Sequence, residues 1–146
     1  MKRITAFALI AIICLASLTS CELLNKSSAA DVLLKDFVSA LVIEDYETAS
    51  TLVHPDSEMT ALLLEEMVNE IQEKLNIDIR KGVVYGACTQ FYLNSNSSLN
   101  GEAITTWEIG YEVEIDGRMV ELQATVYEDS KGMGVLSFEL KVGAGF

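Results

Sequence analysis

The pattern of apolar and polar residues changes twice along this chain. A nearly uninterrupted apolar run covers residues 4–18, just before an acidic sequence begins. Through residues 31–76 the apolar positions recur at helical spacing, and beyond Asn76 they alternate with polar positions as they do in strands. The chain therefore divides into an apolar leader, a helical part and a β part.

Three helices are predicted in the helical part, at residues 31–45, 46–56 and 56–76. The first carries a broad apolar stripe, and the third has apolar residues on one side and glutamates on the other. The second is expected to end near Pro55. Asp56 or Ser57 is expected to cap the third helix, because a side-chain oxygen there can accept a backbone N–H of the first turn.

Four strands are predicted to follow, at about residues 79–94, 103–115, 119–128 and 134–142. In the second strand the apolar side chains point one way and the glutamates the other. Asp116 and Gly117 then form a strong signal for a two-residue hairpin turn. Helices followed by an antiparallel meander with one solvent-exposed face predict an α+β domain, in which N-terminal helices pack against a sheet of about four strands.

The leader has the features of a secretory signal peptide. Lys2 and Arg3 give it a positive start, and its apolar core of about 15 residues is shorter than the roughly 20 that a membrane-spanning helix needs. Residues 18–21 read Leu-Thr-Ser-Cys. This tail resembles the bacterial lipoprotein signal, in which a leucine and two small residues precede a cysteine that becomes lipidated. The resemblance implies that residues 1–20 are removed and that an acylated Cys21 anchors the mature protein in a membrane.

The rest of the chain is expected to hold a short tether and one domain. Residues 21–30 comprise the lipidated cysteine and a stretch with little periodicity, which spans at most about 30 Å when extended. Residues 31–146 have a length that suits a single α+β domain. This domain is then expected to be exported from the cytoplasm and to work close to the cell membrane or outer membrane.

Charge and cysteine content exclude several classes of function. All 22 acidic residues follow the leader, whereas Lys2 and Arg3 belong to it, so the mature chain carries eight basic residues and a net charge of −14. Such a surface repels nucleic acid. With Cys14 removed and Cys21 lipidated, Cys88 is the one cysteine left, and it is expected to be a half-buried structural residue. Because the chain also has a single histidine, the sequence predicts no metal centre and no cofactor.

The order of the elements and the segment FVSALVIEDYETASTLVHPD, residues 37–56, resemble the nuclear transport factor two-like superfamily, which has a cystatin-like cone fold. The resemblance covers roughly residues 31–142. It implies a curved sheet wrapped around the helices to form a cone whose mouth can hold a ligand. The superfamily contains isomerases, cyclases and dehydratases beside members without enzymatic activity, so the resemblance does not name one function.

Tyr85, Trp107 and Tyr111 are the residues expected to line such a cone, with plain core packing as the alternative. A cone-fold enzyme needs an acid or base inside the pocket with a tuned pKa. His54 is expected to serve in a loop or as a cap, because it stands next to Pro55 at a helix junction. The glutamates of the second strand point away from the pocket, so no catalytic residue is predicted.

Two functions follow as hypotheses. The first is a lipid-anchored envelope protein that binds a small apolar ligand or another envelope protein near the membrane. The alternative is a cone-fold enzyme of the isomerase, cyclase or dehydratase type that acts on a small hydrophobic substrate. An ionisable side chain buried among the three aromatic residues would favour the enzyme, and since none stands out, binding is the leading hypothesis. The outer face or the edge of the sheet can pair with a second copy, but no residue specifies the oligomeric state.

Overall fold

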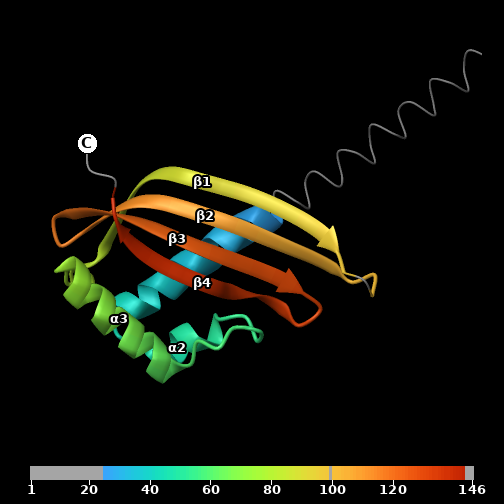
Figure 1. Ribbon diagram of the computed structural model, residues 1–146, viewed down its shortest axis with the longest axis horizontal. Coiled ribbons are helices and arrows are strands. Elements are labelled where there is room, and N and C mark those ends of the chain that lie inside the picture. Colours follow the sequence, from blue (N-terminus) through green and yellow to red (C-terminus); the bar gives the residue numbers. More distant parts are fainter. Residues whose placement is uncertain (1–24, 99, 144–146) are drawn as a thin grey trace, which may run out of the picture.

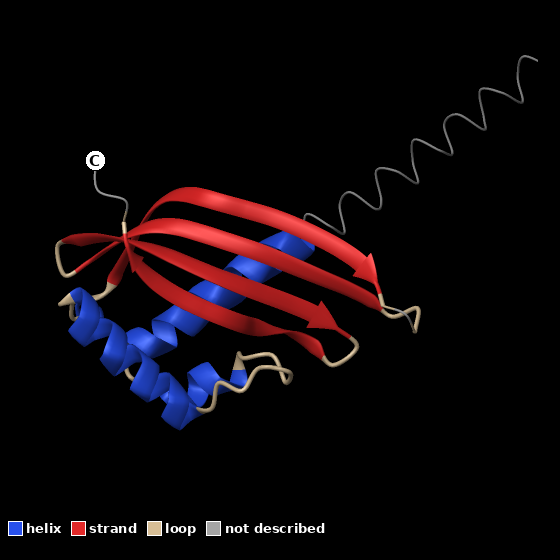
Figure 2. Cartoon of the chain, viewed as in Figure 1, coloured by secondary structure: helices blue, strands red, loops and turns tan. Residues whose placement is uncertain are grey.

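The computed structural model describes residues 25–98 and 100–143. In this part of the chain helices come first, and a curved, open sheet of four antiparallel strands follows (Figure 1, Figure 2). The predicted fold class is therefore confirmed as an α+β arrangement of N-terminal helices packed against a curved antiparallel sheet. Cys21 and the predicted signal peptide at residues 1–20 lie outside the described residues.

Residues 25–42 are helical, and one face of this helix lies at the centre of the core. Leu34, Phe37 and Leu41 recur at helical spacing along that face, and each is fully buried. Figure 1 shows the helix running across one face of the sheet. There the ring of Phe37 meets the ring of Phe138 edge to face, with 5.5 Å between their centroids.

Residues 25–30 belong to this helix, so their assignment to an extended tether is wrong. Ala30 is fully buried, and the hydroxyl of Ser27 accepts the indole N–H of Trp107 at 3.2 Å. Small residues of this kind add no apolar periodicity to the sequence, but they let a helix approach a sheet closely. The part that packs against the sheet therefore begins no later than this segment.

Two further helices, α2 (Tyr46–Thr51) and α3 (Ala61–Leu75), and a 3₁₀ turn at Ile79–Lys81 complete the helical part. Thr60 caps α3, because its hydroxyl accepts the backbone N–H of Leu63 at 3.3 Å. The prediction of Asp56 or Ser57 as the cap is wrong. The Ser57 hydroxyl instead donates to the carbonyl of Leu136 at 3.1 Å, which attaches this segment to the sheet before α3 begins.

The strands are β1 (Val83–Ser97), β2 (Ala103–Ile115), β3 (Arg118–Asp129) and β4 (Gly132–Val142). They pair in sequence order, so β1 and β4 are the two edges of the sheet. The predicted bounds of β2 are confirmed, whereas β1 starts later than expected because the 3₁₀ turn occupies the preceding residues. Asp116 and Gly117 connect β2 to β3 with φ values of 53° and 73°, as a two-residue hairpin turn of this type requires.

Candidate functional site

Trp107 lies in the core of the domain and not at the wall of a ligand cavity. Its side chain has 0% exposure, and its neighbour on the same face of β2, Ile109, has 1%. A side chain without exposed surface adjoins no space that admits a water molecule. This part of the interior is therefore filled by the protein's own side chains, which is the core-packing alternative for Trp107.

Tyr85 and Tyr111 come together in a small cluster with two charged residues of the first helix, Asp31 and Lys35. Their rings meet edge to face with 5.3 Å between centroids. The Tyr111 hydroxyl donates to Asp31 Oδ1 at 2.6 Å, and Lys35 Nζ donates to Asp31 Oδ2 at 2.8 Å. Lys35 Nζ also lies 5.1 Å from the Tyr111 ring centroid and 5.4 Å from that of Tyr85, within cation–π range. The cluster ties the first helix to β1 and β2.

Both tyrosines of this cluster stay protonated at neutral pH. Burial raises the pKa of Tyr85 to about 12, and the nearby carboxylate of Asp31 adds to the effect. Burial also raises the pKa of Tyr111, and its hydrogen bond to Asp31 acts in the same direction. The Tyr85 hydroxyl is buried without a hydrogen-bond partner. Neither phenol is tuned toward the neutral pKa that a general acid or base needs.

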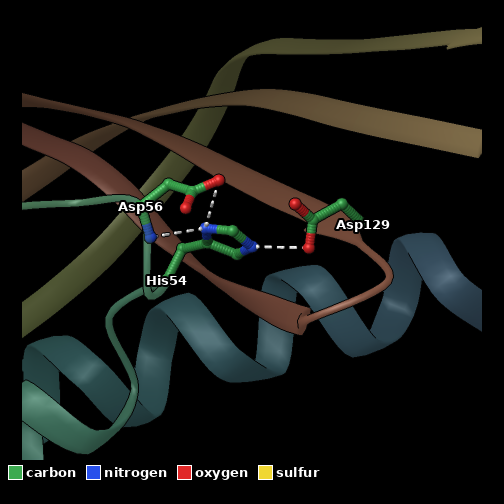
Figure 3. Close-up of side chains that lie close together, drawn as sticks. All are labelled: His54, Asp56 and Asp129. Carbon is green, nitrogen blue, oxygen red and sulfur yellow. Dashed lines mark hydrogen bonds and ion pairs between the residues drawn. The ribbon is translucent and has the colours of Figure 1, made fainter. Parts of the chain in front are cut away.

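His54 is a buried residue with two defined hydrogen bonds, in the loop between α2 and α3 (Figure 3). Its Nδ1 accepts the backbone N–H of Asp56 at 3.1 Å, and its Nε2 lies 3.1 Å from Asp129 Oδ1. Because Nδ1 is an acceptor, Nε2 carries the ring proton and donates it to Asp129. The ring also meets Tyr127 edge to face at 4.8 Å. The loop position of His54 was expected, whereas its full burial and its pairing with Asp129 were not.

This histidine is placed to hold two segments together and not to act on a substrate. Its ring has no exposed surface, and both of its nitrogen atoms already have partners within the protein. Potential ligand atoms of His54, Asp56 and Asp129 lie within 4.8 Å of one another. In the structure the two carboxylates lie at opposite nitrogens of the ring, and Asp56 is also paired with Lys131. The arrangement is therefore a hydrogen-bonded connection between the loop and β3.

The outer face of the sheet carries a shallow polar depression of about 280 Å³. It lies over Gly110, and its rim includes Gln90, Glu108, Gln123 and Glu139. Several of these groups already bond to one another or to neighbours: Gln90 Nε2 donates to Glu108 Oε2, and Lys141 Nζ donates to Gln123 Oε1, each at 3.0 Å. The acidic side chains of β2 point to this side, as expected. The depression is open and its polar groups are largely satisfied, which makes it a weak candidate for a ligand site.

The edge strand β1 is the most unusual surface of the described chain. None of its 15 residues has a charged side chain, whereas β2, β3 and β4 all carry charges. Val84 and Tyr92 are each 66% exposed, and Phe91 is 41% exposed. β1 pairs with β2 along one side, and no other strand of the described part pairs with its far side, which forms the upper rim in Figure 1. β1 is therefore a long, uncharged strand whose outer edge is available for pairing.

Cys88 lies in this strand and is exposed, so the expectation of a half-buried cysteine is wrong. The strand carries register shifts between Tyr85 and Cys88 and between Cys88 and Gln90. Such bulges turn a side chain away from the regular alternation of a strand. The lack of charge in residues 83–97 was visible in the sequence, and the predicted meander already implied that the first strand lies at an edge. The pairing of His54 with Asp129 had no sequence signal, because 75 positions separate the two residues.

No helix of the described residues is both long and apolar enough to cross a membrane. Comparison of the chain with models of protein families, with curated proteins and with solved structures gives no match. The assignments to a lipoprotein and to the nuclear transport factor two-like superfamily therefore stay predictions from the residues that suggested them.

Proposed function

We propose that this protein is a lipid-anchored interaction module of a bacterial cell envelope, which pairs strand to strand with a protein partner through the outer edge of β1. The anchor is the acylated Cys21, as the lipoprotein-like tail of the leader implies. The observation that carries the proposal is the uncharged and exposed outer edge of β1, with which no other strand of the described residues pairs, in a strongly acidic chain. Backbone N–H and C=O groups on such an edge form a template for another strand.

The packing of the interior supports a surface function over a ligand inside the cone. The side chain of Trp107 is fully buried and bonded to Ser27, so it offers a ligand neither space nor a free donor. Tyr85 and Tyr111 have raised pKa values, and His54 is buried with both nitrogens engaged. These observations on the described residues give no support to the alternative of a cone-fold isomerase, cyclase or dehydratase.

Site-specific photo-crosslinking in the native envelope tests the interaction. A photoreactive amino acid replaces Asn94, which is exposed on β1, or Asn69, which is exposed on α3, in the otherwise unchanged chain. We expect a discrete crosslinked protein product from position 94 and none of the same mass from position 69. Equal products at both positions, or none at position 94, would contradict an interaction through β1.

The anchor is tested separately by metabolic labelling with a fatty acid. The Cys21→Ala variant should lose the label and leave the membrane fraction, because the thiol that carries the acyl group is absent. A Cys88→Ala variant is the matched control and should keep both the label and the location. A Cys21→Ala variant that is still labelled would rule out the lipoprotein assignment.

A further inference from the structure

We infer that the partner of β1 is a second copy of this chain, so that two sheets join edge to edge into one antiparallel sheet of eight strands. This inference rests on the proposed function and specifies its partner. The described chain offers four observations that lead to it: an edge segment in regular register, the absence of charge along that edge, an apolar pair of side chains near its middle, and a strongly acidic remainder of the molecule.

The regular part of the open edge covers residues 90–97. These residues pair with β2 from Gln90, opposite Gly110, to Ser97, opposite Ala103, without a register shift. The bulges of β1 are confined to the preceding part, between Tyr85 and Gln90. Eight residues in regular β conformation give an edge about 27 Å long, enough for several interstrand hydrogen bonds with a strand of the same length.

The charge distribution favours a second copy over a different partner. With a net charge of −14 in the mature chain, most surfaces of two copies repel one another. β1 is the one strand of the described sheet where two copies can meet without bringing like charges together. A basic partner, attracted by the acidic remainder, would find no opposite charge to recognise on this strand. The uncharged strand that complements β1 best is therefore β1 itself.

Symmetry then restricts how the two strands can align. Edge-to-edge antiparallel pairing places a two-fold axis perpendicular to the sheet, so each residue lies opposite one that points to the same face. The alignment centred on Leu93 pairs residues 90–96 of the two copies and satisfies this condition. It places Leu93 opposite Leu93 and brings both Phe91 rings to the diagonal positions on the same face. Phe91 pairs with Ile109 on β2, so this is the face that carries the core.

The same alignment places Tyr92 of each copy opposite Asn94 of the other, on the outer face. The double variant Tyr92→Glu/Asn94→Glu therefore introduces carboxylates directly opposite one another at the contact. Its matched control is Leu62→Glu/Asn69→Glu on α3, because Leu62 is 67% exposed and Tyr92 is 66% exposed, and Asn69 and Asn94 are both exposed. Both variants add two negative charges to the chain and replace one exposed large side chain and one exposed asparagine, so the net charge is matched and the position of the charges differs.

Sedimentation of the full chain in density-matched detergent measures the effect. At total concentrations between about 1 and 100 µM, we expect reversible dimers of the wild type and of the α3 control. The dissociation constant of the β1 variant should be at least about tenfold higher, because like charges face each other across the strands. Added salt should strengthen the wild-type dimer, because it screens the repulsion between two acidic chains without weakening uncharged strand pairing.

Hydrogen exchange of the wild type provides a second measurement that needs no variant. Amides of residues 90–97 should become more protected as the concentration rises, while those of α3 stay unchanged. A chain that stays monomeric over the whole range would overturn the inference. So would a dimer that is equally stable in both double variants, or one that gives no added protection to residues 90–97.

The outcomes also separate this inference from the proposed function. A monomeric chain whose position 94 crosslinks to a different envelope protein would overturn self-pairing and leave β1 as an interaction surface. A monomeric chain without any β1-specific crosslink would overturn both. A crosslinked product of twice the mass of the chain, composed of this chain alone, is the expected result.

Discussion

The two edges of the sheet are built in opposite ways. β4 carries Glu139 and Lys141, and the chain before α3 runs alongside it: His54 donates its backbone N–H to the carbonyl of Val135, and Val135 donates to the carbonyl of Leu52, each at 2.9 Å. These bonds form a short parallel bridge on the outer side of β4. β1 has no charged side chain, and no segment of the described residues pairs along its outer side. One edge is partly covered by the chain itself, and within the described residues the other edge is open.

The difference matters because exposed strand edges invite pairing with other chains. Proteins usually protect such edges with charges, bulges or a covering loop. β4 has two of these protections in its charges and its covering segment, while β1 has only bulges near its beginning. Among the residues that the structure describes, the regular part of β1 has none of the three, which is the arrangement expected of an edge that is used for binding.

Opening the β4 edge should have the largest effect on stability. A Cβ atom at Gly134 would overlap the backbone N and Cα of His54, and backbone atoms cannot move aside as a flexible side chain does. The Gly134→Val variant must therefore displace residues 52–54 from β4. We expect it to lower the free energy of unfolding by about 2–4 kcal/mol, measured by chemical denaturation.

Gly143→Ala is the matched control for this variant. A Cβ there would lie 3.4 Å from the nearest atom, the carbonyl oxygen of Met119, which is close to an ordinary contact. Its free energy of unfolding should stay within about 0.5 kcal/mol of the wild type. If Gly134→Val were equally harmless, the covering segment would contribute little to closing the β4 edge.

Replacement of His54 should have the second-largest effect on the free energy of unfolding, because its buried ring holds the segment that bridges to β4. His54→Leu keeps a side chain of similar bulk but removes the donor to Asp129 and the acceptor for the N–H of Asp56. We expect a loss of about 2 kcal/mol in the free energy of unfolding, because the largely buried Asp129 carboxylate keeps only its bond from the Lys131 N–H and the Asp56 N–H loses its acceptor. A second substitution, Asp129→Asn, should then cost less in the His54→Leu background than in the wild type.

The pair also has a pH signature. Burial raises the pKa of Asp129, but hydrogen bonds from the Lys131 N–H and from His54 outweigh burial and hold it below its ordinary value of 3.8. A carboxyl group whose pKa is lowered by folding stabilises the native state above that ordinary value and loses its effect as the pH falls through the folded value. The stability advantage of the wild type over Asp129→Asn should therefore shrink below pH 3.8. An advantage that grows on acidification would contradict an ionised Asp129 in the native state.

Local patterns predicted most of the fold. The strict alternation in residues 103–115 identified β2, and Asp116 with Gly117 identified the hairpin, because both signals arise within one or two adjacent elements. The errors occurred where a distant residue decides. Ser57 bonds to the carbonyl of Leu136 instead of capping a helix, and residues 25–30 extend the first helix to a point where Ser27 accepts the indole N–H of the distant Trp107.

The site was harder to predict than the fold for a related reason. Tyr85 and Tyr111 were expected near each other and do meet, because their strands pair. The sequence could not show that Asp31 and Lys35 of the first helix would satisfy the Tyr111 hydroxyl. The predicted meander placed the first and last strands at the edges, but the sequence could not show that the segment before α3 would bridge to β4.

The smallest effects on the free energy of unfolding are expected from the two tyrosines that link β1 and β2 to the first helix. Tyr111→Phe removes a hydrogen bond to the Asp31 carboxylate and should lower the free energy of unfolding by about 1–2 kcal/mol. Tyr85→Phe is the matched change on β1 itself and should leave stability unchanged or raise it by up to about 1 kcal/mol, because the Tyr85 hydroxyl is buried without a partner. Chemical denaturation of both variants gives the comparison. If Tyr85→Phe were the more costly of the two, that hydroxyl would have a partner in solution, and the open strand would be held more tightly than its described contacts indicate.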